Sequence, residues 1–150
     1  MMAHIAVDGL GPLIDDLTEL AALPDDVVDD MLNAGADVLV QAQQKEVQQQ
    51  WNGPYSIGIS SESIQKDRKI RATKYIGITG HYINVYPKGE RKRGGRSVRN
   101  AEIAFINEHG APKRGIAARP AIFTANAEAA DKAVDASEKV YHAYLDSKNL

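Results

Sequence analysis

The sequence predicts an α+β fold, in which N-terminal helices and a long C-terminal helix pack on a small antiparallel β-sheet with a long exposed basic loop. Apolar residues recur every three or four positions near both ends of the chain, which is the spacing of amphipathic helices. Between residues 57 and 106 apolar and polar side chains alternate instead, as they do in half-buried strands. No linker divides the 150 residues, so we expect a single domain over 1–150.

Two helices are expected before the strands. The first covers residues 12–23, where leucines recur at helical spacing. The second begins near Pro24, a residue suited to the first helical position, and runs to about Gln50. Its apolar stripe consists of Val28, Met31, Gly35, Val38 and Ala42. A glycine inside a helix costs about 1 kcal/mol relative to alanine, so Gly35 suggests close approach of another backbone.

The middle of the chain is expected to form the sheet. One strand is expected around residues 69–73, and alternation continues through 76–78 and 83–85, with Gly80 as the turn between these two pairs. Residues 101–107 carry apolar side chains at both odd and even positions, which predicts a strand covered on both faces.

Two loops and a final helix complete the prediction. Residues 87–97 combine three glycines with dense positive charge and no large apolar side chain, so we expect an exposed, mobile loop. Residues 110–118 form a second loop. Pro120 is expected to open the last helix, whose apolar stripe consists of Ile122, Ala125, Ala129, Ala133, Ala136, Val140 and Tyr144.

The composition excludes several classes of protein. The chain has no cysteine, which excludes a disulfide scaffold, a thiolate zinc site and a cysteine nucleophile. It has no apolar run of about 18 residues, so we expect no membrane span. The first residues lack a basic segment followed by an apolar run, so we expect no secretory signal and a cytoplasmic site of synthesis.

The net charge of −2 conceals a strong segregation of charge. Residues 1–60 carry −9, residues 61–120 carry +9 and residues 121–150 carry −2. The acidic part includes Asp25, Asp26, Asp29 and Asp30, which we expect to form an inter-subunit face. The basic part includes Lys88, Arg91, Lys92, Arg93, Arg96 and Arg99. The acidic part of one copy is therefore suited to the basic part of another.

Motifs for catalysis and metal binding are not found in the sequence. The glycines of residues 89–97 do not have the spacing of a phosphate-binding loop, and the four histidines do not have metal-ligand spacing. Glu108 and His109 are interpreted as a polar pair at a strand end, and the four aspartates at 25–30 as a solvated helix face rather than a cation site. We therefore expect no enzyme activity, no metal and no cofactor.

The basic segment from Lys88 to Arg99 has two interpretations with a function. It contacts either DNA or an acidic protein surface, because six cations in twelve positions exceed what solubility requires. The alternative without a function is a solvated loop tip.

Three stretches carry a resemblance to a known family. They are Val85-Tyr86-Pro87-Lys88-Gly89, then residues 98–110 with the sequence Phe-Ile-Asn-Glu-His-Gly at their end, then Ala118-Arg119-Pro120-Ala121-Ile122. In this pattern the chain resembles the head–tail joining or tail-completion proteins of long-tailed bacteriophages. The resemblance covers most of the chain after Trp51.

The resemblance implies a non-enzymatic virion protein that forms a homo-oligomeric ring at the neck or the top of the tail, after assembly in the host cytoplasm. Its implied partners are connector or adaptor proteins, tail-tube or tail-terminator proteins, and DNA passing through the ring, with no membrane. It implies structural roles for Phe105, Asn107, Glu108, Gly110, Arg119 and Pro120. In this picture 107–110 fixes a sheet-to-loop turn, Arg119-Pro120 sets the start of the long helix, and Arg119 pairs with a carboxylate such as Glu108.

Overall fold

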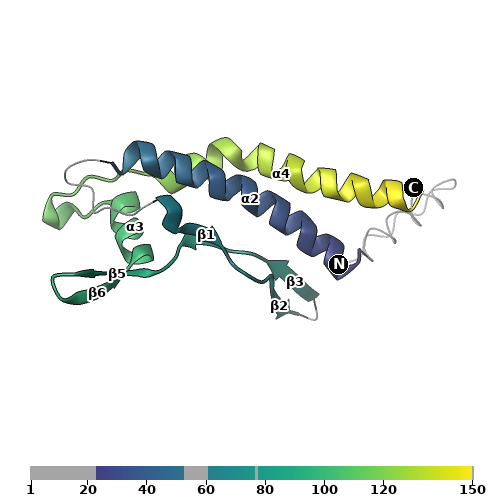
Figure 1. The fold of residues 1–150 in the computed structure, drawn as a ribbon, viewed down its shortest axis with the longest axis horizontal. Helices are drawn as coiled ribbons and strands as arrows, with labels where there is room; N and C mark the ends of the chain where they lie inside the picture. The colour runs from purple at the N-terminus through teal and green to yellow at the C-terminus, as the bar shows by residue number, and fades with distance from the viewer. Residues whose placement is uncertain (1–22, 53–60, 77, 150) are drawn as a thin grey trace.

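The computed structural model describes residues 23–52, 61–76 and 78–149 (Figure 1). The fold is α+β, as the sequence predicts. Its helices are α2 (Asp25–Gln50), α3 (Asn100–His109) and α4 (Ala121–Ser147), with short 3-10 turns η1 (Ser61–Ser63) and η2 (Pro112–Arg114). The helix expected over residues 12–23 lies outside the described residues.

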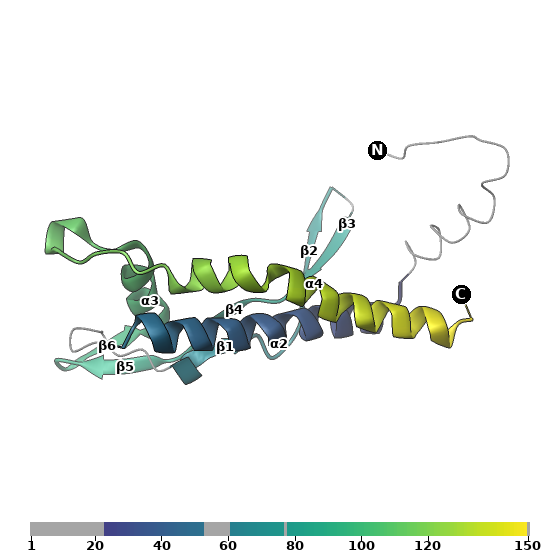
Figure 2. The ribbon, with the colours of Figure 1, turned by 90° about the horizontal axis from the view of Figure 1, so that it is seen from above.

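Helices α2 and α4 pack side by side as a long antiparallel pair that gives the molecule its elongated shape (Figures 1 and 2). Asn126 near the start of α4 accepts a hydrogen bond of 2.8 Å from Gln43 near the end of α2. Ser137, further along α4, donates one of 2.8 Å to the carbonyl of Met31 near the start of α2. The predicted starts of both helices are confirmed within one residue, because proline precedes each of them, and the predicted end of α2 at about Gln50 is confirmed as well.

The close approach expected at Gly35 is confirmed. A Cβ atom at this position would lie 3.0 Å from Ser137 Oγ and 3.3 Å from the carbonyl oxygen of Ala133. The buried face of α2 nevertheless differs from the expected stripe: Gly35, Ala36, Gln43 and Val47 are buried, whereas Val28, Met31, Val38 and Ala42 are only partly so. The face is rotated because α2 packs between α4 and the strands.

The strands form three separate antiparallel ladders rather than the single sheet that the sequence predicts. β1 (Ile64–Lys66) pairs with β4 (Val85–Pro87), β2 (Arg71–Tyr75) with β3 (Ile78–Tyr82), and β5 (Glu90–Arg93) with β6 (Arg96–Arg99). Gly80 is not the turn: it lies inside β3 opposite Thr73, and the register closes this hairpin between Tyr75 and Ile78. The ladders lie along the pair of helices α2 and α4 (Figure 1).

The strand expected over residues 101–107 is wrong, because this segment is helix α3. Its buried residues are Asn100, Ile103, Ala104 and Asn107, which are three or four positions apart and therefore share one face of a helix. The apolar side chains at odd and even positions lie at different points around this helix, so that Ile103 and Ala104 are buried and Phe105 is 65% exposed.

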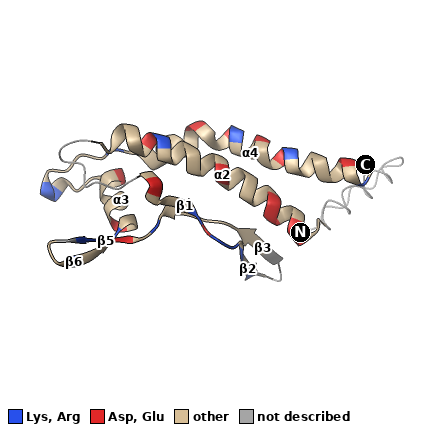
Figure 3. Cartoon of the chain, viewed as in Figure 1, with Lys and Arg blue, Asp and Glu red and all other residues tan. Residues whose placement is uncertain are grey.

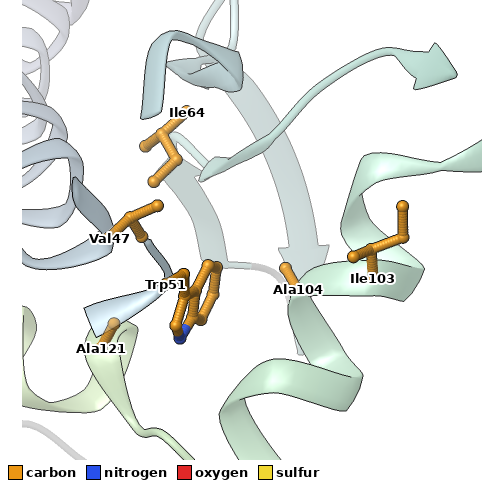
Figure 4. Close-up of a cluster of buried hydrophobic side chains, with 6 residues drawn as sticks. All are labelled: Val47, Trp51, Ile64, Ile103, Ala104 and Ala121. Atoms are coloured by element: carbon orange, nitrogen blue, oxygen red, sulfur yellow. The ribbon is translucent and has the colours of Figure 1, made fainter. Parts of the chain in front are cut away.

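A small hydrophobic core joins the end of α2 to α3, β1 and the start of α4 (Figure 4). It consists of Val47, Trp51, Ile64, Ile103, Ala104 and Ala121. The Trp51 indole stands in its centre and donates a hydrogen bond of 2.8 Å to the carbonyl of Arg119. No helix within the described ranges has the length and apolar character needed to cross a membrane.

Asp67 holds together the segments that follow β1 and precede β4. Its side chain is 5% exposed and accepts a hydrogen bond of 3.1 Å from the Asn84 amide, while its own amide donates one of 2.8 Å to the Asn84 carbonyl. The Arg71 guanidinium lies 3.2 Å from the same carboxylate. Burial alone would raise the pKa of Asp67, but the Asn84 amide and the Arg71 charge outweigh it and hold the pKa below its ordinary value.

We therefore expect the free energy of unfolding to fall as the pH is lowered below about 4, the ordinary aspartate pKa. The sign follows from linkage, because a carboxylate with a depressed folded-state pKa stabilises the fold above its unfolded-state pKa and loses this contribution as it becomes protonated. Urea titrations of the wild type and Asp67→Asn from pH 7 to pH 3 measure the effect. The variant should lose stability at neutral pH and show a weaker dependence on pH; equal slopes would contradict the assignment.

Candidate interaction surfaces

The basic segment forms an ordered β-hairpin, which corrects the mobile loop expected from the sequence. Strands β5 and β6 pair in register from Glu90–Arg99 to Arg93–Arg96, leaving Gly94 and Gly95 as a two-residue turn. Their φ angles are 55° and 78°, and hairpin turns of this kind need positive φ at both central residues. The glycines that suggested mobility therefore specify a tight turn.

Buried Asn100 fixes the base of this hairpin to α3. Its backbone amide donates to the Gly89 carbonyl at 2.9 Å, and its side-chain amide donates to the Lys88 carbonyl at 2.7 Å. Its side-chain oxygen accepts a hydrogen bond of 3.1 Å from Arg91 Nε. Sequence reasoning missed this residue, because a single asparagine at the end of a strand carries no pattern that distinguishes it from a surface residue.

The six cations of the segment are not equivalent. Lys88 donates to the Lys66 carbonyl at 2.6 Å, Arg91 is bound to Asn100, and Arg99 forms an ion pair of 2.8 Å with Glu102. The side chains of Lys92 and Arg96 are exposed and form no hydrogen bond or ion pair with any residue that the structure describes. For Arg93 the structure describes the backbone alone, paired with Arg96. The hairpin therefore presents Lys92 on one face and Arg96 on the other, because they lie in adjacent rows of the ladder, while Lys88, Arg91 and Arg99 at its base are engaged within the chain.

The acidic group lies at the first turns of α2. Asp25, Asp26 and Asp30 are exposed, and Asp29 is half-buried. His81 of β3 faces this group, with Nδ1 3.3 Å from Asp29 and Nε2 3.7 Å from Asp25. No group of three metal-ligating side chains occurs in the described part of the chain. The aspartates thus form a solvent-facing surface with one histidine contact, which sequence spacing alone did not reveal.

The acidic group and the basic β-hairpin lie at opposite ends of the pair of helices α2 and α4 (Figure 3). At the basic end, the loop that contains η2 projects toward the same end of the molecule as β5 and β6 and adds exposed Lys113 and Arg114. At the acidic end, exposed Arg71 and Lys74 of β2 place some positive charge near the aspartates. The acidic and basic parts of the sequence are therefore also separated in space. At the acidic end, Arg71 and Lys74 partly offset the negative charge of the aspartates.

The residues of the family pattern meet where α2, α3 and α4 converge. The carbonyl of fully buried Asn107 accepts a hydrogen bond of 2.7 Å from the Arg119 backbone amide. The Arg119 guanidinium donates to the Gln50 carbonyl at 3.1 Å and contacts the Asn107 side-chain oxygen at 3.4 Å. Arg119 therefore ties the end of α2 to α3, immediately before Pro120 and the start of α4.

The pairing of Arg119 with Glu108 is wrong. Glu108 instead accepts hydrogen bonds from the backbone amides of Ile122 at 2.9 Å and Phe123 at 2.7 Å. The first amides of a helix have no partner within that helix, and they carry its positive dipole end, so a carboxylate stabilises this position. Glu108 acts as the cap of α4, a role that spacing in the sequence cannot distinguish from an ion pair.

Gly110 ends helix α3 and begins the second loop, so the turn here is helix-to-loop rather than sheet-to-loop. Its φ of 73° and ψ of 176° belong to a region that is almost restricted to glycine. Phe105 lies outside the core and its ring contacts His109 one turn later, with centroids 4.5 Å apart. Asn107 and Arg119 thus contact each other directly, whereas Glu108 and Gly110 contact the backbone of residues 116–123.

Comparison of the chain with models of known protein families, with curated proteins and with solved structures finds no match.

Proposed function

We propose that this protein is a non-enzymatic structural subunit of the head–tail junction of a long-tailed bacteriophage, where identical copies join end to end in a ring. The observation that carries the proposal is the position of the acidic group and the basic hairpin at opposite ends of an elongated body (Figure 3). Two different, complementary surfaces on one chain favour a head-to-tail contact, and such contacts close into rings when the rotation between copies allows it. The resemblance in residues 85–124 supplies the biological setting.

The individual contacts support this role. Asp26 and Asp30 at one end, and Lys92 and Arg96 at the other, are exposed and have no partner among the described residues. Asp25 and Asp29 are held by His81, and Lys88, Arg91 and Arg99 are held by other contacts within the chain, which fixes the position of each surface. In the proposed ring, the aspartates of one copy face the hairpin of the next, and connector or tail-tube proteins bind the two faces of the ring.

Assembly is expected to weaken with salt, because the screening length falls from about 10 Å at 0.1 M to about 3 Å at 1 M ionic strength. Reversing both free cations in Lys92→Glu/Arg96→Glu should weaken assembly at low salt by about tenfold or more, from two lost contacts and new repulsion. Static light scattering of the wild type and the variant across a salt series, together with negative-stain images, measures the extent of assembly.

The matched control for this experiment is Lys132→Glu/Lys139→Glu, which changes the net charge equally on the middle of α4, where both lysines are exposed. Assembly of this control should equal that of the wild type. A chain that stays monomeric or dimeric at every salt concentration, alone and with connector proteins, would contradict the proposed ring.

The second candidate function is DNA binding by the same hairpin, favoured by the exposure of Lys92 and Arg96 at a projecting tip. Two free cations predict a weak, salt-dependent affinity for duplex DNA, with a log–log slope of about −2. If Lys92→Glu/Arg96→Glu abolishes DNA binding and leaves assembly intact, the hairpin contacts DNA. If it disrupts assembly, the hairpin contacts protein.

A further inference from the structure

Helix α4 has a second apolar stripe, on a side that the described residues leave exposed. Ala121, Ala125 and Ala129 are buried, because this side of α4 packs against the rest of the molecule. Phe123 and Val134, however, are 70% and 56% exposed, and Ala127 and Ala130 between them are exposed as well. Phe123 and Val134 are eleven residues apart, so at about 100° per residue they point within about 20° of each other.

An apolar groove lies beside Val134. It has a volume of about 390 Å³ and lies where α2, α4 and the segment before β4 meet. Its walls are formed mainly by Met31, Leu39, Ile83, Val134 and Tyr141. A dry cavity of about 150 Å³ is large enough for benzene, so this groove has room for a phenyl ring. Phe123 of the same chain cannot fill it, because eleven helical residues separate it from Val134 by about 17 Å.

We propose that this face of α4 is a contact with a second copy of the chain, related by a two-fold axis. An antiparallel pairing of two α4 helices, centred between Glu128 and Ala129, sets Phe123 opposite the partner's Val134. It also sets Ala127 opposite the partner's Ala130. Each phenyl ring then enters the groove of the other copy, and the alanines allow the helices to approach closely at the centre. A surface that is complementary to itself in this way is what a two-fold interface requires.

The charges around α4 agree with the antiparallel direction. The loop that precedes α4 carries exposed Lys113 and Arg114. The second half of α4 carries exposed Asp131, Asp135 and Glu138 on the flank of the apolar stripe. Antiparallel pairing brings the basic beginning of one helix toward the acidic half of the other, whereas parallel pairing would set like charges side by side. The occupant of this face is therefore a second copy in the antiparallel direction.

The mass of the protein at about 1 M salt tests the contact, because an apolar interface survives at a salt concentration that screens exposed ion pairs. Sedimentation equilibrium should give a dimer of 16.3 kDa chains for the wild type. Phe123→Ala should weaken the dimer about tenfold or more, as is common for an aromatic residue that fills a pocket of the partner. Phe105→Ala is the matched control, since Phe105 is 65% exposed on α3, outside the proposed contact, and this variant should dimerise as the wild type does.

Disulfide cross-linking tests the antiparallel register, and the chain offers a clean background because it has no cysteine. A mixture of Ala127→Cys and Ala130→Cys should form a mixed disulfide between the two variants under mild oxidation. Ala101→Cys, a change of another exposed alanine on α3, should not cross-link at the same rate. Each variant oxidised alone gives the rate of cross-linking between identical positions, and non-reducing gels should show more disulfide dimer in the mixture than in either variant alone.

Each outcome decides the proposal independently of the proposed ring. A monomer at high salt, a dimer unaffected by Phe123→Ala, or cross-linking only between identical positions overturns the α4 contact. An unchanged dimer mass in Val134→Lys overturns it as well, because a lysine in the wall of the groove should exclude the partner's phenyl ring. A high-salt dimer that does not assemble further at low salt retains the α4 contact and rejects the ring.

Discussion

Replacing Trp51 with alanine is expected to lower the free energy of unfolding by about 3–5 kcal/mol, which is the usual cost of truncating a large aromatic residue in a core. Trp51 is 2% exposed and lies in the cluster that joins α2, α3, β1 and α4 (Figure 4). The change also removes the 2.8 Å hydrogen bond to the Arg119 carbonyl, which then keeps a single bond of 2.8 Å from the Ala121 amide. The effect is large because few buried residues hold these elements together.

Urea denaturation monitored by circular dichroism measures this change. Trp51→Phe keeps an aromatic ring but removes the N–H donor, so it should cost less than the alanine variant and more than zero. Phe123→Ala, a truncation of an aromatic residue that is 70% exposed, is the matched control and should change stability by under about 0.5 kcal/mol in the monomer. Equal losses for Trp51→Ala and Phe123→Ala would show that the core does not depend on Trp51.

Replacing Gly110 with alanine is expected to destabilise the protein by about 3 kcal/mol or more, through two separate effects. The first is conformational, because its φ of 73° with an extended ψ is nearly restricted to glycine. The second is steric, because a Cβ atom would lie 2.7 Å from the Ala118 amide nitrogen and 2.8 Å from the Ile116 carbonyl oxygen. Both neighbours are backbone atoms and cannot rotate away.

Gly115→Ala is the comparison variant with a positive φ but neither the extended ψ nor the close packing of Gly110. Gly115 has φ 69° and ψ 21°, in the left-handed region, and a Cβ atom there meets no other atom within 4 Å. Its replacement should therefore cost only about 1–2 kcal/mol. Thermal unfolding of both variants under identical conditions gives the comparison. If the two variants lose equal stability, neither the extended ψ of Gly110 nor its close packing against residues 116–118 contributes.

The sequence determined the outer elements of the fold because their signals are local. The periodicity of α2 and α4, with a proline immediately before each of them, located both helices correctly. The fold class also followed from this pattern. Gly35 indicated a close helix contact, since a residue that is unfavourable in a helix needs a reason from outside it. The charges of residues 1–120 likewise indicated two distinct surfaces before their positions were known.

The short elements of the middle were decided only by tertiary contacts. In residues 101–107 the pattern of apolar side chains fits both a strand and a short helix, and burial of Ile103 and Asn107 on one face resolves the choice. The basic segment contains no apolar alternation, so its strands depend on the Gly94–Gly95 turn and on Asn100, which binds it from another element. A one-residue signal of this kind has meaning only once its partners are known.

The candidate surfaces divide in the same way. Composition identified which charges are abundant, but only the folded chain determined that Lys88, Arg91 and Arg99 are engaged and that Lys92 and Arg96 are exposed. It also determined that Glu108 caps α4 instead of pairing with Arg119. The physical reason is the range of the forces involved: periodicity and turn preference act between neighbours in the chain, whereas burial, capping and ion pairing join residues that are distant in sequence and become adjacent only on folding.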